Sequence, residues 1–327
     1  LYRRVSDRQT MGSVVGELKV SLGEVEKSLD QFFRTPQEKA GLHVAVSQLG
    51  QMRGVLSVLG LEQAVHTVAR MRNTVDQILD TEVDEAMARI GGFTYQMEAS
   101  QDLALTGLDI GEKPSVLSAV LKYHNTERMR KTLNDAMDIH GGKAVVLGPR
   151  NYLARAYQAI PIAITVEGAN ILTRSMIIYG QGAIRCHPFV LREMKAAMSN
   201  DAAEFDKAIT GHINFVISNV FRSLWMGLTG AKLVGSPKGG EVAAYYKQLT
   251  RFSSAFALLS DMAMFSLGGS LKFREKLSAR LGDMLSNLYI ASACLKRFER
   301  DGAPKEDLPV LQWAVENALY DLQQAMD

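Results

Sequence analysis

The sequence predicts an all-α protein built from helical bundles. Apolar residues recur at spacings of three and four along most of the chain, as they do on one face of an α-helix. No convincing run alternates apolar and polar residues in the way that a half-buried strand does. Glycine and proline stand where the helical stretches stop. With 327 residues, of which 47% are hydrophobic, the chain can bury a sizeable core.

Residues 1–85 show the pattern of three amphipathic helices. Each helix has one apolar face, formed by Leu18, Leu22, Val25, Leu29 and Phe32, by Leu42, Val46, Leu49 and Leu56, and by Leu61, Ala64, Val68, Met71, Val75 and Ile78. Thr35-Pro36 should end the first helix, and Gly60 should cap the second. Three such helices joined by short turns are typical of a bundle.

An acidic stretch at residues 80–85 separates this bundle from a new segment, which we expect to open at Ile90-Gly91-Gly92. Pro114 stands where a helix can start, because proline is tolerated at the first helical position. That helix should run to Gly141-Gly142. A loop with Pro161 is expected next, followed by a helix from near Gly168 to Tyr179.

After Pro188 the sequence predicts further amphipathic helices as far as Asp327. The expected breaks lie near Ser236-Pro237, Gly268-Gly269 and Asp301-Gly302. One apolar stripe contains Phe252, Phe256, Leu259 and Met262, and another contains Leu277, Leu281, Met284, Leu288 and Ile290. These stripes favour the core of a bundle over a ligand pocket. Basic residues between 272 and 280 alternate with apolar ones, so a solvated helix face or a membrane-surface face is possible.

Composition excludes several classes of function. Lys and Arg total 37 against 35 Asp and Glu, with no long run of like charge, which argues against nucleic acid as a partner. Cys186 and Cys294 are too far apart for a CxxC pair, so a reducing cytoplasm fits best. No two of the six histidines have zinc-ligand spacing, so we expect no metal. The sequence predicts no transmembrane helix. It begins at Leu1, which favours a fragment.

The run from Glu127 to Pro188 carries the chemistry. It reads ERMRKTLNDAMDIHGGKAVVLGPRNYLARAYQAIPIAITVEGANILTRSMIIYGQGAIRCHP. This run resembles the C-terminal helical domain of acyl-CoA dehydrogenases, and it is most similar to their bacterial long-chain branch. The resemblance begins near Ala88, includes Gly111 to Ser115, and continues to the end of the chain. It implies a dehydrogenase domain at residues 88–198 and a helical extension of it at residues 199–327.

Glu167, within Val166-Glu167-Gly168, is the catalytic residue that the resemblance implies. In the family, the glutamate at this place removes the α-proton of the acyl thioester while a hydride leaves the β-carbon for the flavin. A helix N-terminus nearby favours the carboxylate anion by about 0.3–1 kcal/mol. Burial beside apolar groups favours the neutral acid by up to roughly 4–7 kcal/mol. Desolvation would therefore win in a buried site and make Glu167 a stronger base. The plain alternative is a helix-capping acid.

The resemblance also implies an FAD surface made of His140, Gly141, Gly142, Gly168, Ala169 and Asn170. A glycine backbone can lie close to a phosphate or ring, although a glycine pair at a helix end is equally an ordinary C-cap. Many family members have Thr where this chain has Ala169. Asn170, Thr173 and Arg174 either touch flavin or substrate, or pair locally. Arg155 and Arg185 either meet cofactor phosphates or are solvated.

A second resemblance concerns residues 48–64, which read QLGQMRGVLSVLGLEQA. They are similar to the core of histidine phosphotransfer domains of chemotaxis-type kinases. Gly50 occupies the position of the phospho-accepting histidine, and glycine has no nucleophile. His43 and His66 do not take that position. Residues 1–85 therefore resemble a degenerate phosphotransfer bundle, with a generic helical bundle as the alternative.

Together these observations predict part of a flavin-dependent dehydrogenase of fatty-acid β-oxidation. The resemblance implies long-chain acyl-CoA as the substrate, FAD as the cofactor and an electron-transfer flavoprotein as the acceptor. It also implies a homo-oligomer, located in the cytoplasm or peripheral to the inner membrane. In this family a β-rich middle domain holds most of the flavin, and these residues show no such domain, so the chain is not expected to complete a site alone. The alternative is a non-catalytic helical interaction module of a signalling protein.

Overall fold

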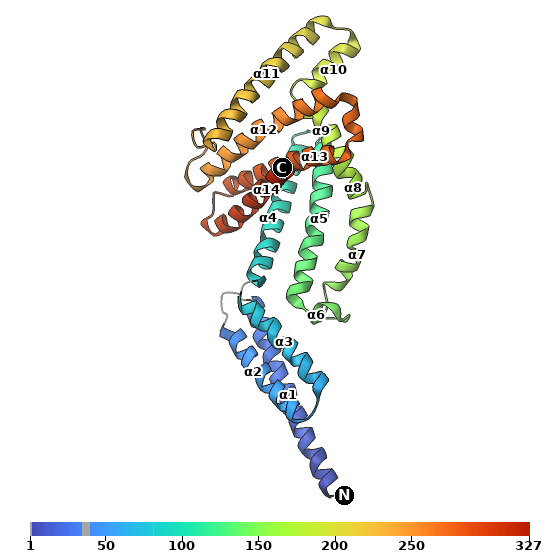
Figure 1. Ribbon diagram of the computed structural model, residues 1–327, viewed down its shortest axis with the longest axis vertical. Coiled ribbons are helices and arrows are strands. Elements are labelled where there is room, and N and C mark those ends of the chain that lie inside the picture. The colour runs from blue at the N-terminus through green and yellow to red at the C-terminus, as the bar shows by residue number, and fades with distance from the viewer. Residues whose placement is uncertain (1, 35–39, 81) are drawn as a thin grey trace. The chain divides into compact units, whose positions relative to one another are not determined.

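The computed structural model describes residues 2–34, 40–80 and 82–327, without the side chains of residues 2–11, 13, 33–34, 77–80 and 82–84. Within these ranges the secondary structure is entirely helical, which confirms the all-α prediction (Figure 1). The predicted helix end at Thr35-Pro36 lies outside the described residues. The chain divides into two compact units, residues 1–86 and residues 87–327.

The first unit contains α1 (Tyr2–Arg34), α2 (Ala40–Val58) and α3 (Glu62–Asp80), and α2 packs against the other two. Val25, Phe32, Leu42 and Leu49 are buried, as their helical spacing predicted. Val46, which the spacing placed on the apolar face of α2, is only half-buried, and other residues complete the buried face. Gly60 has a φ of +69°, the left-handed conformation of a C-terminal cap.

Helix α4 (Glu82–Asp109) corrects one prediction, because Gly91 and Gly92 lie inside it and do not open a segment. The pair reflects a close approach between helices. A Cβ atom on Gly92 would lie 1.8 Å from Cε3 of Trp313 in α14 (Leu308–Met326). Trp313 also meets the ring of Phe93 edge-on, with centroids 5.4 Å apart. Gly92 is therefore a packing residue that gives the indole its space.

Helix α5 (Ser115–His140) begins directly after Pro114 and is capped by Gly141, as predicted. A short turn, α6 (Gly142–Val145), leads to α7 (Ala154–Thr165), which contains Pro161. The prediction of a loop around Pro161 is wrong, since buried Ala154 and Ile160 hold this helix while it packs against α5. Pro161 donates no backbone hydrogen bond to the Tyr157 carbonyl, and both residues are exposed, so water can replace that partner.

The helix predicted from near Gly168 to Tyr179 exists and extends further. It runs through α8 (Asn170–Leu172), the π-helical turn η1 (Thr173–Ile178) and α9 (Tyr179–Arg185). The π-turn packs closely against α13 (Glu275–Arg300). A Cβ atom on Gly282 of α13 would lie 3.3 Å from the Arg174 carbonyl oxygen. Such turns are frequent near functional sites.

The remaining helices follow in the predicted order. They are α10 (Val190–Ser199), α11 (Ala202–Thr229), α12 (Ala243–Leu267), α13 and α14, with the 3-10 turns η2 (Gly240–Val242), η3 (Gly268–Phe273) and η4 (Lys305–Asp307) between them. The breaks expected near 236–237, 268–269 and 301–302 all fall between helices, which confirms them. Figure 1 shows α11 and α12 side by side, and they pack against each other.

Helix α13 forms the centre of the second unit. Its residues Ile290, Cys294 and Leu295 are buried against α4, α12 and α14. Leu281 and Met284 are buried in a neighbouring cluster with residues of α9, α12 and α14. The predicted core stripes on α12 and α13 are thus confirmed, apart from Met262 of α12, whose side chain is 57% exposed.

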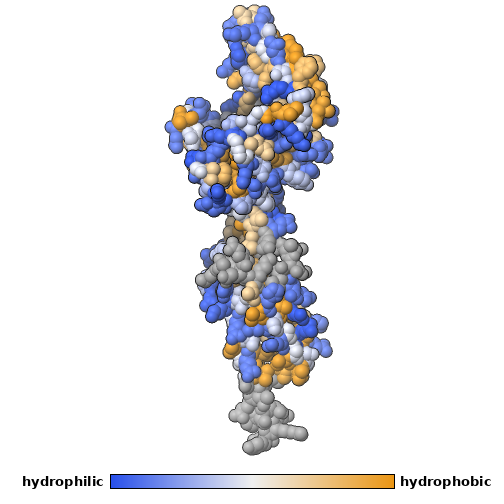
Figure 2. All heavy atoms as spheres, turned by 90° about the vertical axis from the view of Figure 1, so that its left-hand side faces the viewer, coloured by the Kyte–Doolittle hydropathy of each residue, from blue (hydrophilic) through white to orange (hydrophobic). Residues whose placement is uncertain are grey.

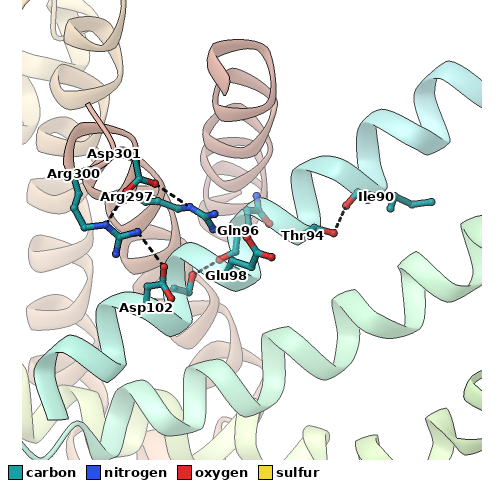
Figure 3. A network of polar contacts seen from close by, with 9 residues as sticks. Ile90, Thr94, Gln96, Glu98, Asp102, Arg297, Arg300 and Asp301 are labelled. Atoms are coloured by element: carbon teal, nitrogen blue, oxygen red, sulfur yellow. Dashed lines mark hydrogen bonds and ion pairs between the residues drawn. The ribbon is translucent and has the colours of Figure 1, made fainter. Parts of the chain in front are cut away.

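Polar contacts join α4 to α13 at the edge of this core (Figure 3). Arg297 pairs with Glu98 at 2.7 Å, and Arg300 pairs with Asp102 at 3.2 Å. In the same view, Gln96 of α4 lies at the inner side of the network. Its side-chain amide donates to the Ala314 carbonyl of α14 at 2.6 Å. These contacts fix the position of α4 along α13 and α14.

Candidate functional site

The predicted catalytic residue, Glu167, lies in a sharp turn between α7 and α8. Val166 is extended, and then two successive residues adopt left-handed backbone conformations, Glu167 with φ +54° and Gly168 with φ +91°. This conformation costs a non-glycine residue about 1–3 kcal/mol and persists only where the surroundings impose it. The turn therefore needs anchors, and the structure supplies them from α5.

Lys122 of α5 is the main anchor. Its ammonium donates to the Gly168 carbonyl and to Oδ1 of Asn170, both at 2.6 Å. The amide of Asn170 donates to Oγ1 of Thr126 and to Oε1 of Glu127, both at 2.8 Å. Asn170 is 5% exposed, so these bonds lie largely out of water and are costly to lose. They fasten the turn after Glu167 to α5.

The residues after Glu167 all have local partners, and their contact with flavin or substrate stays a prediction. Both amide hydrogens of Asn170 are used within the protein, so Asn170 positions the turn. Thr173 donates to the Gly168 carbonyl at 3.3 Å. The Arg174 guanidinium binds both carboxylate oxygens of Asp283, and this hydrogen bonding is the main cause of a raised Arg174 pKa. All three residues pair locally.

Sequence reasoning did not find Lys122. The available signal was weak, namely a lysine and a threonine four residues apart on one face of a predicted helix. Nothing in that spacing shows that the face meets a turn more than forty residues later. Only the packing of α5 against α7 and η1 brings Lys122 to Gly168.

The Glu167 side chain is exposed and makes no hydrogen bond or ion pair with any described residue. The burial on which the desolvation argument depended is therefore not present in this structure. Several residues near it in the sequence are nevertheless apolar and exposed: Ile162 is 61%, Val166 49% and Ile171 77% accessible. An apolar ligand that bound to these exposed side chains would also exclude water from the Glu167 carboxylate.

The predicted flavin surface at His140-Gly141-Gly142 forms the end of α5. Gly141 has a φ of +56°, and its N–H donates to the Met137 carbonyl at 2.9 Å, which makes it a C-cap. A Cβ atom on Gly141 or Gly142 would meet nothing within 4 Å, so this backbone is open to an approaching ligand. Cap and ligand surface are compatible here, and the flavin contact remains a prediction.

The ring of His140 is held in one orientation. Nδ1 lies 2.8 Å from the Ala136 carbonyl oxygen, and Nε2 lies 2.8 Å from the hydroxyl of Tyr152. A carbonyl only accepts, so Nδ1 carries the proton and Nε2 accepts from Tyr152. Of the other predicted contacts, Arg185 donates to Ser115 at 2.8 Å, and Arg155 is exposed. Ala169 lies between Gly168 and α8, half-buried.

A buried ionisable cluster lies away from Glu167. Oδ1 of Asp261 is 3.1 Å from Nε2 of His187 and 3.1 Å from Nε2 of His212, whose Nδ1 lies 2.8 Å from Glu193. Burial favours neutral groups here, but the hydrogen bonds outweigh it, so the pKa of His212 is raised and the pKa of Asp261 is lowered. The sequence did not indicate this cluster, since its members come from α10, α11, α12 and the turn before α10.

The three side chains His187, His212 and Asp261 are close enough to suggest a metal site. The hydrogen bonds of His187 favour a different interpretation. Its Nδ1 accepts from the backbone N–H groups of Phe189 and Val190, at 3.2 and 3.1 Å. The ring proton is therefore on Nε2, the nitrogen that would have to bind a metal. We interpret the cluster as an ionic link between α10, α11 and α12.

A cavity of the second unit is also separate from Glu167, which is not among its lining residues. It has a volume of about 740 Å³ and lies among α9, α11, α12 and α13, with Ala183, Phe256 and Leu285 in its lining. None of the predicted site residues lines it. In the first unit, Gly50 lies within α2, while His43 and His66 are exposed.

Comparison with known families shows that the resemblance begins earlier in the chain than Ala88. Residues 39–180 match the family model described as acyl-CoA dehydrogenase, C-terminal domain. Residues 184–327 match the model described as acyl-CoA dehydrogenase, C-terminal, bacterial type. The first matched range includes α2 and α3, the helices that carry the phosphotransfer-like pattern. The two ranges together cover most of the chain.

Among solved structures, the fold is similar to the crystal structure of an acyl-CoA dehydrogenase complexed with FAD from Bacillus anthracis. The TM-score is 0.54 at 14% sequence identity, over 74% of this chain. The match spans 40% of the length of the Bacillus anthracis protein. Because the two family models together cover most of its length, the chain belongs to the acyl-CoA dehydrogenase family and corresponds to its C-terminal helical region.

Proposed function

We propose that this chain carries the catalytic base of a fatty acyl-CoA dehydrogenase, and that the base is Glu167. The observation that carries the proposal is the turn itself. Glu167 has a strained backbone conformation in a turn that Lys122 anchors, and exposed apolar residues lie near it in the sequence. Strained and anchored residues of this kind cluster at functional sites. Glu167 would remove the α-proton of the acyl thioester and produce a trans-2 double bond.

Bound FAD would supply the acceptor for the hydride that leaves the β-carbon. His140, Gly141 and Gly142 would contact it where both glycines leave the backbone open, and Gly168 and Ala169 would contact it beside the base. Asn170, also predicted to bind FAD, would support this second contact through its hydrogen bonds to Lys122 and Thr126. We further propose long-chain acyl-CoA of β-oxidation as the substrate, a homo-oligomer as the assembly and an electron-transfer flavoprotein as the acceptor.

The test compares Glu167→Gln with an unchanged chain. Residues 39–327, the range that the two family models match, are joined to the N-terminal and middle domains of a bacterial long-chain acyl-CoA dehydrogenase, and acyl-CoA-dependent reduction of a dye is measured. The amide keeps the size of the side chain but cannot accept the proton, so kcat should fall by about 10²–10⁴-fold. Glu112→Gln, which changes an exposed glutamate outside the turn, is the matched control and should retain full activity.

The flavin absorbance spectrum distinguishes the two interpretations of Glu167, as a catalytic base or as a structural capping residue. A base acts mainly in the transition state, so Glu167→Gln should keep its flavin and its substrate affinity. Near-normal turnover in Glu167→Gln would place the base elsewhere. Loss of flavin together with activity would make Glu167 a structural capping residue.

We also propose that the protein is cytoplasmic and attaches to an anionic membrane surface through α11. Ile213, Ile217, Phe221, Leu224, Trp225 and Leu228 form a continuous stripe on this helix, each at least 50% exposed. The stripe lies opposite the buried residues Ala208, Asn219 and Met226 of the same helix. Figure 2 shows hydrophobic patches on the surface of the second unit.

The charge of the residues near this stripe favours an anionic lipid surface as its binding partner. Between Asp206 and Glu241 the chain has no carboxylate, whereas Arg222, Lys232 and Lys238 are basic. Trp and Phe on an apolar face flanked by basic residues are typical of helices that lie in the membrane interface. The neighbouring segment Gly240–Phe273 is long and apolar enough to cross a membrane, but Leu249, Phe252 and Ala263 within it are core residues.

Vesicle sedimentation tests this attachment. The chain should sediment with phosphatidylglycerol vesicles and not with phosphatidylcholine vesicles, and Phe221→Ser with Leu228→Ser should abolish the effect. A matched pair of changes at exposed apolar positions elsewhere, Val145→Ser with Val146→Ser, should leave binding unchanged. Equal loss in both variants, or no sedimentation of the parent, would refute the assignment to α11.

A further inference from the structure

A second cavity of the second unit, about 350 Å³ in volume, has an unusual lining. It lies among α4, α5, α13 and α14. Its wall is mostly polar and contains Phe93, His124, Arg128, Lys131, Arg280 and Asp321, among others. Glu127 belongs both to this lining and to the anchor of the Glu167 turn, but the other polar side chains have no role in the proposed dehydrogenation and need a separate explanation.

Arg128 of α5 is the central group. It is 5% exposed, and it donates through Nε to Oε1 of Gln96 at 2.6 Å and through Nη1 to Nδ1 of His124 at 2.8 Å. Both partners are neutral, and no described carboxylate lies within hydrogen-bond distance of the guanidinium. Gln96 is itself fixed by the Ala314 carbonyl. A rigid, buried cation without an ion-paired anion is costly unless something else supplies negative charge.

His124 supplies a second donor without an acceptor. A guanidinium can only donate, so Nδ1 of His124 must accept from Arg128 and the ring proton must be on Nε2. Burial, and next the charge of Arg128, lower the pKa of His124 well below its ordinary value, which keeps the ring neutral. Nε2 is buried and has no hydrogen-bond partner among the described residues. The Nε2–H group therefore lacks the acceptor that buried donors normally have.

The charges around the cavity do not balance. Lys131 accompanies Arg128 over the Phe93 ring, at 5.7 and 5.6 Å from its centroid, and has no carboxylate partner among the described residues. Arg280 donates through Nε to the Ala325 carbonyl at 2.9 Å. These three cations face one unpaired carboxylate, Asp321, whose pKa burial raises despite Arg128 and Lys131.

The other carboxylates of the lining are already occupied. Glu127 accepts from Asn170 at 2.8 Å, and Asp283 is bound to the Arg174 guanidinium. The buried side-chain oxygen of Asn287, an acceptor, also has no hydrogen-bond partner among the described residues. The cavity thus has an excess of positive charge and of unused donors from Arg128, His124 and Lys131.

We propose that this cavity is a binding site for a phosphate group. A tetrahedral oxyanion can accept from several donors at once, and guanidinium and ammonium groups are its usual partners in proteins. His124, Arg128 and Lys131 follow one another at spacings of four and three on α5, so they present their donors from one helix face. Arg280 of α13 closes the site from another helix.

Titration calorimetry on the 327-residue chain tests the site, with inorganic phosphate as the probe and sodium chloride used to hold the ionic strength constant. We expect saturable binding of one phosphate. Lys131→Gln removes a donor at an exposed position, so folding should be unaffected, and it should weaken binding about tenfold or more. Arg130→Gln removes the same charge from the adjacent, exposed position of α5, outside the cavity, and should change the affinity less than twofold.

Two further measurements locate the phosphate and identify its source. The ¹⁵N resonance of His124 Nε2 should shift on addition of phosphate, and the shift should be absent in His124→Phe. Titration with coenzyme A tests whether the bound phosphate belongs to a larger ligand. Of inorganic phosphate and coenzyme A, the one that the site prefers should displace the other at the lower concentration. The proposal is wrong if Lys131→Gln and Arg130→Gln lose affinity equally, if phosphate leaves the His124 resonance unchanged, or if phosphate binding does not saturate. Glu167→Gln should not affect any of these results, so they are independent of the proposed catalytic role.

Discussion

Gly91 and Gly92 are adjacent in α4, yet alanine should have opposite effects at the two positions. In a helix interior, alanine is more stable than glycine by about 0.5–1 kcal/mol. At Gly91 the new methyl group would lie 3.8 Å from Val310, an ordinary contact, so this gain should be realised. At Gly92 the methyl group would lie 1.8 Å from Trp313, and the indole would have to move. Overpacking of this kind costs about 1–3 kcal/mol.

The net expectation is a loss of roughly 1–2 kcal/mol for Gly92→Ala, after the gain in helix propensity is subtracted. In a unit of this size, about 1 kcal/mol shifts Tm by roughly 2–4 °C. Gly92→Ala should therefore lower Tm by about 2–8 °C, and Gly91→Ala should raise it by about 1–4 °C.

Tryptophan fluorescence measures both variants. The chain has two tryptophans, and replacement of the exposed Trp225 by Phe leaves Trp313 as the reporter. Thermal unfolding of Gly91→Ala and Gly92→Ala is then followed in this background. Equal Tm values for the two variants, or a higher Tm for Gly92→Ala, would refute the close contact between α4 and α14.

Two other predictions concern polar clusters of the second unit. In urea denaturation, Asn170→Leu should destabilise the unit by about 2–4 kcal/mol, because Lys122 and Glu127 lose a buried partner. The control Asn214→Leu, at an exposed position of α11, should have little effect. A loss below about 0.5 kcal/mol for Asn170→Leu would contradict the anchoring role. The raised pKa of His212 means that its contribution to stability is complete below its ordinary pKa of 6.5 and disappears as the pH rises through the folded-state value. The stability lost in His212→Gln should therefore be largest near pH 5–6 and should shrink at higher pH, and a pH-independent difference would disprove the link.

Local patterns in the sequence determined the helical elements. The spacing of residues such as Leu42 and Leu49, or Leu281 and Met284, predicted faces that are buried in the structure. Gly60 and Gly141 predicted helix ends because a left-handed residue stops a helix wherever it occurs. These signals depend on a few neighbouring residues, so they can be read without knowledge of the fold.

Predictions from local patterns were wrong where packing against a distant segment outweighed the local preference. Pro161 is tolerated in α7 because buried Ala154 and Ile160 hold the helix while it packs against α5. Gly92 lies inside a helix because Trp313, more than two hundred residues later, requires the space. In both cases tertiary packing contributes more free energy than the local preference for a turn, which amounts to about 1–3 kcal/mol.

The candidate site shows the same division. The sequence alone predicted Glu167, His140, Gly141 and Gly142 as site residues, because they lie in one short run whose residues resemble those of acyl-CoA dehydrogenases. It could not identify Lys122 as the anchor of the turn, assign Asn170 to a supporting role, or bring His124, Arg128 and Lys131 to a cavity with Arg280. Hydrogen bonds and charges act over a few ångströms in space, and only the tertiary structure decides which residues, far apart along the chain, come within that distance.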